Sequence, residues 1–365
     1  MADKIDYHQT VDYSQADPAK VLAQQEGLAT ASNMPYGFRE VSGTRGESGY
    51  VFQMGDSYGA LVQEGLGSKS LITQAVYAKT GVSYFGAVAQ DTVACIINDL
   101  VSVGATPVVL NAYWSASSYE WLTDHTLTTD FIKGWRAACD LSGVVWGGGE
   151  TQSLSGVVAP GSLEFAGSAF GVIQDKKRLI SGDNLHSGDA IVLIEASGVH
   201  ANGISLVREI AGKLPDGYQT KLADGSTYGE TALIPTHLYA KLVEALFTAN
   251  VDVHYLSNIT GHGWRKLMRA TPEFTYRMHT VTPVHEIFNF IAEKSGNDEI
   301  DMYGNFNMGA GYAVYVPAAD AEKVVEVAKA QNLQAWTAGV VETGPKQVII
   351  EPNGITFAGD TLEVR

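Results

Sequence analysis

The segment QDTVACIINDLVSVGATPVVL, residues 90–110, determines the predicted fold. Small and apolar residues recur in it at helical spacing as far as Val101, and Gly104 then marks the end of the helix. The β-branched run at 108–110 follows as a strand. A helix, a tight turn and a strand in this order are typical of α/β layers.

Two carboxylates interrupt this apolar helix. Asp91 and Asp99 are eight residues apart, a little over two turns, so they lie near one helix face. Burial of a bare carboxylate costs several kcal/mol unless a partner neutralises it. One interpretation is a solvated face or an internal salt bridge. The other is an Mg²⁺ site, because Mg²⁺ prefers oxygen ligands and usually bridges to nucleotide phosphate. The segment alone leaves both open.

Composition describes an ordinary globular chain. Its 365 residues suit two domains, with 45% hydrophobic and 18% charged residues. The formal charge of −16 disfavours a general nucleic-acid binder. Cys95 and Cys139 lie inside apolar helical patterns, which indicates a reducing compartment. Residues 1–10 lack a signal-peptide core, and no apolar run approaches the roughly 20 residues that span a bilayer. We therefore expect a cytoplasmic protein without membrane contact.

The sequence pattern divides the chain into three parts. Residues 1–50 are expected to form an N-terminal arm, mostly loop, with a short helix at 18–25 capped by Asp17. Residues 51–175 form a first domain and 176–365 a second, with the boundary at the charged break 174–179. Strand and helix patterns alternate in both domains, which predicts α/β or α+β layers.

A first glycine-rich loop, Glu64-Gly65-Leu66-Gly67-Ser68-Lys69, follows a predicted strand at 58–63. It lacks Walker A spacing, so it is either a simple turn or a phosphate loop of another kind. Glu64, at a strand end beside flexible glycines, is well placed to be a metal ligand.

A second glycine-rich segment, Gly147-Gly148-Gly149-Glu150-Thr151, follows a predicted buried strand at 144–146. It is either a hairpin turn or a tip where backbone amides approach a ligand and present Glu150.

Further loops follow strands in the second domain. The strand at 190–195 leads into a loop with His200 and Asn202, and a helix at 204–210 follows, which is an anion-binding geometry. A single loop histidine is more often simply hydrogen-bonded. A helix is predicted at 236–248 and a strand at 251–256, before a turn of Thr260, Gly261, His262 and Gly263.

Taken in order, these motifs resemble those of the aminoimidazole ribonucleotide (AIR) synthetase family, also called phosphoribosylformylglycinamidine cyclo-ligase. The family motifs D-G-V-G-T-K, D-L-V-A-M-x-V-N-D-L, G-G-E-T, S-S-G-x-H-S-N-G, L-x-P-T, H-[LI]-T-G-G-G and F-N-x-G-x-G are similar to residues 64–69, 91–100, 148–151, 196–203, 233–236, 258–263 and 306–311. The resemblance covers about residues 55–345. Glu64 replaces Asp, Ser68 replaces Thr, and His262 replaces the middle glycine.

The resemblance implies two α/β domains, with the first-domain sheets of two subunits joined in a barrel-like homodimer core. It implies conversion of formylglycinamidine ribonucleotide, a small phosphoribosyl substrate, to aminoimidazole ribonucleotide with ATP and Mg²⁺. It also implies site roles. Metal ligands would be Glu64, Asp91 and Asp99; catalytic residues Asp99, His200 and Asn202; nucleotide-binding residues Gly65, Gly67, Ser68, Lys69, Asn98, Gly148, Gly149, Glu150 and Thr151; and substrate-binding residues Thr260, Gly261, His262 and Gly263.

Two alternatives stay open. Selenophosphate synthetase, thiamine monophosphate kinase and the hydrogenase-maturation dehydratase use ATP on related folds. The first needs an early reactive cysteine and the third a cysteine tail, whereas no Cys precedes Cys95 and the chain ends Leu-Glu-Val-Arg. The kinase has paired aspartates where Glu64 and Gly65 stand. A non-catalytic, nucleotide-binding paralogue is the second alternative.

Overall fold

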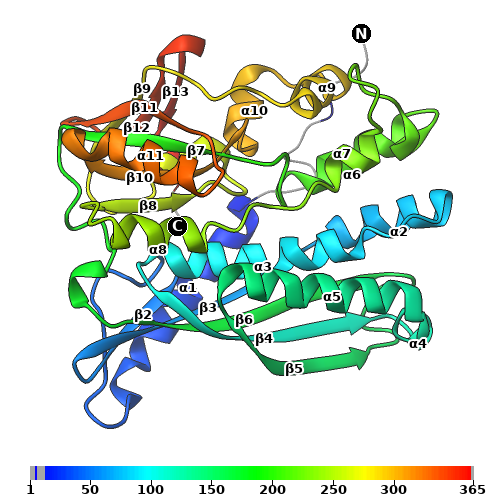
Figure 1. The fold of residues 1–365 in the computed structure, drawn as a ribbon, viewed down its shortest axis with the longest axis horizontal. Helices are drawn as coiled ribbons and strands as arrows, with labels where there is room; N and C mark the ends of the chain where they lie inside the picture. The colour runs from blue at the N-terminus through cyan, green and yellow to red at the C-terminus, as the bar shows by residue number, and fades with distance from the viewer. Residues whose placement is uncertain (1–4, 6–12, 363–365) are drawn as a thin grey trace.

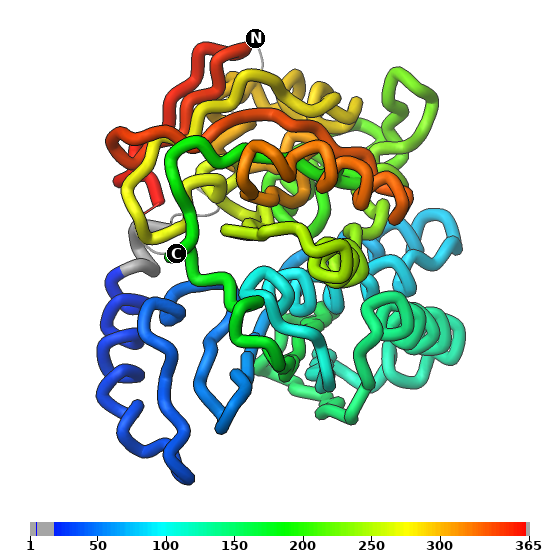
Figure 2. The backbone as a smooth tube through the Cα atoms, turned by 60° about the vertical axis from the view of Figure 1, so that its left-hand side comes forward, coloured from blue at the N-terminus to red at the C-terminus, as the bar shows by residue number. Residues whose placement is uncertain are grey.

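The computed structural model describes residue 5 and residues 13–362. The chain forms two sheets, each with its own helices, and α3 (Phe85–Ser102) lies between them (Figure 1). The strands of the first sheet all precede residue 174, and those of the second all follow residue 188. The intervening linker, green in Figure 2, runs along one side of the molecule.

The first sheet is curled and mostly antiparallel, and only β4 and β5 pair in parallel. Its strand order is β1 (Arg39–Glu40), β2 (Tyr50–Met54), β3 (Ser57–Gly65), β6 (Leu163–Ile173), β4 (Thr106–Ala116) and β5 (Val145–Ser153). The helices of this half are α1 (Tyr13–Ala29), α2 (Lys69–Thr80), α3, α4 (Tyr119–Thr123) and α5 (His125–Ser142).

The second sheet has seven strands, in the order β13 (Ile355–Ala358), β12 (Gln347–Ile350), β9 (Thr275–Met278), β11 (Ala335–Glu342), β7 (Asp189–Glu195), β10 (Ala310–Pro317) and β8 (Tyr255–Asn258). Its helices are α6 (Ile204–Lys213), α7 (Tyr228–Ala232), α8 (Ala240–Thr248), α9 (Glu286–Ser295), α10 (Glu299–Asn305) and α11 (Ala321–Ala330). Short 3-10 segments are η2 (Ala31–Asn33), η3 (Lys176–Arg178), η4 (Gly217–Gln219), η5 (Gly263–Met268), η6 (Ala318–Asp320), η7 (Glu351–Asn353) and η8 (Gly359–Leu362).

Helix α3 is the shared core element of the two halves. It packs against β3 and β6 of the first sheet and also contacts β8 of the second. Most of its side chains are buried, as expected for a helix covered on several sides. At its C-terminal end the hydroxyls of Ser102 and Tyr312 are 2.7 Å apart, which links α3 to β10. The polar residues Asp91, Asn98 and Ser102 of α3 are therefore buried against protein, whereas Asp99 is half-buried.

Several predicted elements have different bounds in the structure. Helix α8 begins at Ala240 rather than at 236, because the backbone of residues 236–239 is hydrogen-bonded to α3. Helix α1 begins at Tyr13, so Pro18 lies inside it and Asp17 is not its cap. Strand β8 is shifted to Tyr255–Asn258.

The segment at 147–151 is neither a tip nor a hairpin turn. Strand β5 continues through it to Ser153, at the exposed edge of the first sheet. A β-bulge opposite Leu110 and Asn111 accommodates the glycines. A Cβ on Gly149, where φ is +156°, would lie 2.1 Å from the Ala112 carbonyl oxygen, so close strand pairing explains this glycine.

The residues that the structure describes include no helix that combines the length and the apolar composition needed to cross a bilayer.

Candidate functional site

A buried ion pair joins the first glycine-rich loop to α3. Lys69, the first residue of α2, places its Nζ 2.8 Å from Asp91 Oδ2, and both side chains are fully buried. The Lys69 ammonium also donates to the carbonyl oxygens of His200 at 2.8 Å and Ile234 at 3.2 Å. Asp91 Oδ1 accepts from the backbone N–H of Thr236 at 2.8 Å and from its hydroxyl at 2.5 Å. These contacts tie the two domains together through one charged pair.

Both oxygens of Asp91 are therefore occupied by protein groups. Burial raises the pKa of the Asp91 carboxyl, and Lys69 and Thr236 oppose that shift by stabilising the carboxylate. A metal would have to displace Lys69 to reach this carboxylate. The geometry therefore matches the internal salt bridge, one of the two interpretations of this carboxylate from the sequence.

Asn98, on the same helix as Asp91, binds the backbone of the residues that follow Thr236. Its Nδ2 donates to the carbonyl of His237 and its Oδ1 accepts from the N–H of Tyr239, both at 2.9 Å. Gln90 adds a bond of 2.9 Å to the carbonyl of Thr236. Since both ends of the Asn98 amide bind backbone, this side chain fixes the segment 236–239 in a non-helical form.

Glu64 and Asp99 come together in a second charged cluster between the domains. Glu64 lies near the end of β3 and Asp99 lies on α3. The charge of Asp99 raises the pKa of Glu64, and both carboxylates act to raise the pKa of Lys266. Lys266 and Arg269, from η5 and its C-cap, lie near enough for their charges to lower the pKa of Glu64. Asn258 on β8 donates to Asp99 Oδ1 at 2.7 Å. The cluster thus places two acids and two bases from different domains in one site.

Burial is the main cause of the shifted pKa values of Glu64 and Lys266 in this cluster. Burial, and next the charge of Asp99, raises the pKa of Glu64 to about 7, against the opposing effect of Lys266 and Arg269. Burial, and next the charge of Arg269, lowers the pKa of Lys266 to about 7. Perturbed groups of both signs in one interdomain site are a recognised signature of functional sites.

The end of the predicted arm closes one side of this cluster. Glu47 accepts a hydrogen bond of 2.8 Å from the hydroxyl of Tyr255, and its Oε2 is 3.8 Å from Arg269 Nε. Arg269 also donates to the carbonyl of Gly46 at 3.3 Å. Residues 46–47 therefore contact the second-domain residues beside this cluster.

The two glycine-rich turns differ in what their backbone contacts. Gly67, with φ of +72°, has open space around it, so the 65–68 turn can approach another molecule. Gly263 has φ of +52°, and a Cβ there would lie 2.3 Å from the Tyr303 carbonyl oxygen. Its N–H already donates to the Thr260 carbonyl at 2.8 Å. Packing on α10 therefore explains Gly263, and its amide is used within the turn.

His200 is buried, with a positive φ of 57° in the loop before α6. Its Nε2 accepts the N–H of Ser197 at 3.1 Å, which assigns the ring proton of the neutral form to Nδ1. Burial and the charges of nearby cationic groups hold the pKa of His200 well below its usual range, so the ring is neutral near pH 7. Asn202 lies half-buried just before the helix.

Glu150 lies apart from the acidic pair. The strand register aligns Glu64 on β3 with Gly149 on β5, through Gly167 on β6 and Ala112 on β4. Gly149, and with it the next residue Glu150, is therefore three strand spacings from Glu64, about 14 Å. Within one chain the structure therefore brings Glu64 and Asp99 together, but not Glu150.

Several contributors to these sites were missed from the sequence. They are Glu47, Asn258, Lys266 and Arg269 around the acidic pair, and His237 and His285 beside the 196–200 loop. Lys266 and Arg269 follow the Gly261–Gly263 turn directly in sequence, which is the one signal that pointed to them.

Comparisons with known proteins identify the family of the chain. Residues 46–173 match the N-terminal domain, and residues 186–351 the C-terminal domain, of the family described as AIR synthase related protein. The phosphoribosylformylglycinamidine cyclo-ligase of Methanococcus maripaludis is 31% identical over 313 residues, covering 86% of this chain and 84% of that protein. That of Rippkaea orientalis is 31% identical over 327 residues, covering 86% and 91%.

Solved structures share the fold at low identity. The structure described as AaThiL complexed with AMPPCP and TMP superposes with a TM-score of 0.62 at 13% identity and covers 97% of each chain. T. maritima PurL complexed with FGAR gives 0.60 at 17% identity, covering 88% of this chain and 48% of that one. With both domain profiles matched in order, and with relatives above 30% identity over most of its length, the chain belongs to the AIR synthase related family.

Proposed function

We propose that this protein is an ATP-dependent phosphoribosylformylglycinamidine cyclo-ligase, which converts formylglycinamidine ribonucleotide to aminoimidazole ribonucleotide with release of ADP and phosphate. The proposed reaction is the one in the name of its relatives, phosphoribosylformylglycinamidine cyclo-ligase. The observation that carries the proposal is the interdomain cluster in which Asp99 is bound by Asn258 of the second domain and the charges of Asp99, Lys266 and Arg269 act on Glu64. Carboxylates and cations in one site are what phosphoryl transfer requires.

The reaction explains that requirement. An amide oxygen is a poor leaving group, so ATP first phosphorylates it. The internal amine then attacks the same carbon, and the oxygen departs as phosphate. Positioning and charge neutralisation supply most of the catalysis in such transfers.

The donor set fits Mg²⁺ at Glu64 and Asp99, since both offer carboxylate oxygens and the charge of Asp99 acts on Glu64. A bound Mg²⁺ would neutralise the phosphates of ATP. Lys266 and Arg269 are placed to bind the transferring phosphate from the second domain. Asp91 is assigned a positioning role, because its oxygens are bound by Lys69 and Thr236.

Lys69 and Asn98 are assigned to the scaffold with Asp91, because their polar atoms bind protein groups. Other predicted residues are proposed to contact ligands. The 65–68 turn has room for nucleotide phosphate, and Gly148 to Thr151 present an exposed edge. His200, as a neutral ring, would act by orienting its loop beside Asn202, since its low pKa makes it a weak base. Thr260 to His262 remain candidates for the substrate phosphate.

The direct test is an ATP-dependent turnover assay with formylglycinamidine ribonucleotide, in which aminoimidazole product and ADP are measured together. We expect equimolar product and ADP. ADP release without the aminoimidazole would identify another substrate, and nucleotide binding without turnover would identify a non-catalytic paralogue.

The Mg²⁺ requirement should depend on pH. Glu64 must be ionised to bind Mg²⁺, and its pKa is raised to about 7, so protons compete with the metal below that pH. The Mg²⁺ concentration for half-maximal activity is expected to fall about tenfold between pH 6 and pH 8. Loss of charge from Lys266 over the same range acts in the same direction. Glu64→Gln should reduce this pH dependence to the part that Lys266 contributes, and an identical Mg²⁺ requirement at pH 6 and 8 in the parent protein would contradict the prediction.

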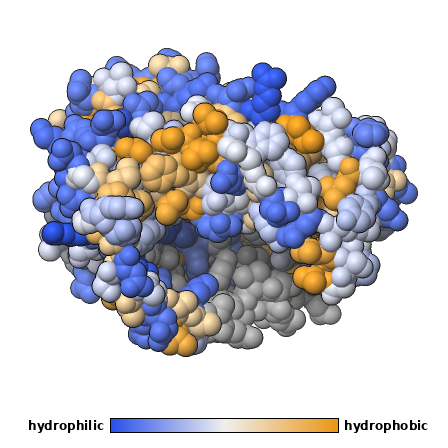
Figure 3. All heavy atoms as spheres, turned by 90° about the horizontal axis from the view of Figure 1, so that it is seen from below, coloured by the Kyte–Doolittle hydropathy of each residue, from blue (hydrophilic) through white to orange (hydrophobic). Residues whose placement is uncertain are grey.

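A homodimer is supported by an apolar row on the uncovered face of the first sheet. Leu61, Phe170, Val109 and Val145 are directly paired across four strands, and Leu61 and Val145 are 44% and 66% exposed. Their strand neighbours on the opposite face, such as Val62 and Leu110, are buried. Figure 3, which views the molecule from this side, shows apolar residues gathered there. Such a row favours a subunit interface.

Replacing Leu61 and Val145 in this apolar row by lysine should therefore separate the subunits, because like charges would meet in the proposed interface. We expect the parent protein to sediment as a dimer at micromolar concentration and the Leu61→Lys/Val145→Lys variant as a monomer. Val157→Lys, at a loop position that is 79% exposed, is the matched control and should stay dimeric. A parent protein that is monomeric at these concentrations would contradict the proposal.

A further inference from the structure

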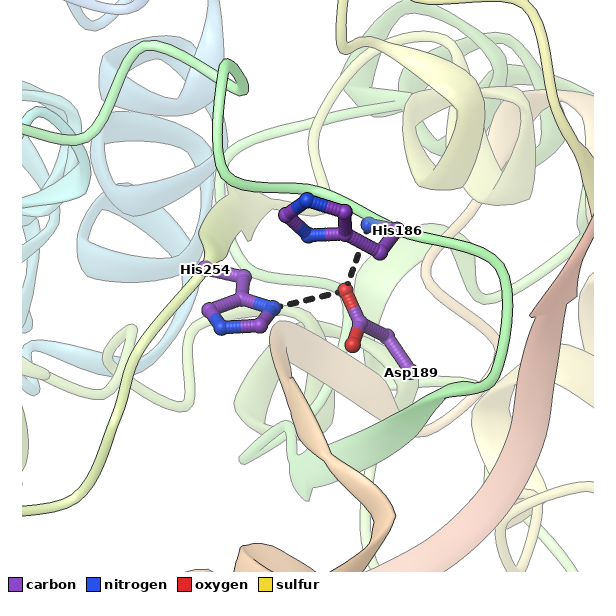
Figure 4. A group of neighbouring side chains, drawn as sticks. All are labelled: His186, Asp189 and His254. Atoms are coloured by element: carbon purple, nitrogen blue, oxygen red, sulfur yellow. Dashed lines mark hydrogen bonds and ion pairs between the residues drawn. The ribbon is translucent and has the colours of Figure 1, made fainter.

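A group of side chains with the chemistry to ligate a metal lies outside the interdomain cluster. His186, Asp189 and His254 each place one ligand atom within 4.8 Å of the others (Figure 4). Within the part of the chain that the structure describes, this is the one group of three or more His, Cys, Asp or Glu side chains with that geometry. Neither the proposed reaction nor its Mg²⁺ uses these residues.

The fold brings the three residues together from separate segments. His186 ends the linker between the sheets, Asp189 begins β7, and His254 directly precedes β8. Strand β10 pairs with both strands, with Pro317 opposite Asp189 and Tyr315 opposite Tyr255. The site therefore lies where the ends of two strands meet the linker.

The contacts of Asp189 fix the site. Its side chain is 5% exposed, and Oδ2 lies 2.8 Å from His254 Nδ1 and 2.8 Å from the backbone N of His186. The rings of His186 and His254 have centroids 5.5 Å apart. His186 is exposed and His254 is 12% exposed, so the group opens to solvent on the His186 side.

A neighbouring carboxylate supports ligation by His254. While its Nδ1 faces Asp189, its Nε2 lies 3.4 Å from Asp252 Oδ2. A metal-bound histidine commonly donates its second ring N–H to a carboxylate, which fixes the tautomer and orients the ring. Asp252 is itself positioned, because its backbone N–H donates to Asp320 Oδ2 at 2.9 Å.

We infer that His186, Asp189 and His254 form a binding site for a divalent transition metal of the Zn²⁺ type. Two imidazoles and one carboxylate suit Zn²⁺, Co²⁺ or Ni²⁺, whereas Mg²⁺ prefers oxygen ligands alone. Binding replaces the hydrogen bond between His254 and Asp189 and releases its proton. The two ligand atoms need to separate only from 2.8 Å to about 3.3 Å for tetrahedral coordination at Zn–ligand distances near 2.0–2.1 Å. A bound metal would connect His186 of the linker to Asp189 and His254 at the second sheet.

The test is Zn²⁺ binding by the full-length, untagged, chelator-treated protein, measured in competition with a chromophoric chelator. We expect one Zn²⁺ per chain, unaffected by millimolar Mg²⁺, and the visible absorption of four-coordinate Co²⁺ when Co²⁺ is used instead. His186→Ala should weaken binding at least tenfold and abolish the rise in Tm on Zn²⁺ addition. It is the decisive variant, because His186 is exposed and its removal leaves the bond between Asp189 and His254 in place.

The matched control is His279→Ala. His279 also pairs with a carboxylate, Glu351 at 2.8 Å, but it lies outside the three-residue group. We expect His279→Ala to bind Zn²⁺ like the parent protein. Absence of stoichiometric binding in the parent, or equal binding by His186→Ala, would overturn the inference. Because the readout is metal binding, the result is independent of whether the proposed cyclo-ligase activity is found.

Discussion

Asp99→Asn is expected to lower ATP-dependent turnover on the order of 10²- to 10³-fold, the range seen when a group that stabilises transition-state charge is removed. The substitution keeps the shape of the side chain and its capacity to accept the bond from Asn258. It removes one of the two charges that the proposed Mg²⁺ site requires. The measurement is kcat for the aminoimidazole product at saturating Mg²⁺ and ATP.

Stability separates this effect from damage to the fold. Asp99 raises the pKa of Glu64, so its charge opposes ionisation of its neighbour. Asp99→Asn should therefore leave Tm unchanged within about 3 °C, which corresponds to less than about 1–2 kcal/mol for a chain of this size. Asp140→Asn, at an exposed position paired with Arg136 on α5, is the control and should retain full activity. Near-parental turnover by Asp99→Asn would reject the metal assignment.

The sequence predicted element types well where patterns were strong. The helix and strand of residues 90–110 became α3 and β4, and the strand predicted at 190–195 is β7. The family and the two-sheet architecture followed from motif order, and both are confirmed. Failures occurred where tertiary contacts override local preference. Residues 236–239 have helical composition, but Asp91 and Asn98 bind their backbone from another domain.

The candidate site was only partly predictable, because tertiary contacts decide which partner each side chain meets. Spacing on α3 placed Asp91 and Asp99 near one face, yet it could not assign them different partners. One meets Lys69 in the core and the other meets Asn258 at the domain boundary. Spacing also could not reveal that Glu150 extends an edge strand, because a run of glycines in sequence fits a turn as well as a bulged strand. Partners from the second domain, such as Lys266, are far from α3 in sequence, so spacing along the helix does not predict them.

The Lys69–Asp91 pair carries the largest expected effect on stability. Lys69→Met leaves the Asp91 carboxylate buried without its cation, and breaking a buried pair from one side costs about 3–5 kcal/mol. The carbonyls of His200 and Ile234 also lose their donor. We expect this loss in the free energy of unfolding measured by urea titration. Lys213→Met, which breaks an exposed pair with Glu209, should cost less than about 0.5 kcal/mol.

A double variant tests whether the charge itself is responsible. Asp91→Asn keeps an oxygen acceptor for Thr236 but removes the charge that Lys69 neutralises. Lys69→Met/Asp91→Asn should therefore be more stable than the sum of the single losses predicts, with a coupling of about 1–3 kcal/mol. Additive losses would show that Lys69 acts through the carbonyls of His200 and Ile234 alone. A coupling of the expected size, with Asp91 buried and bound by Lys69, would place this carboxylate in the interdomain scaffold and leave Glu64 and Asp99 to bind the metal.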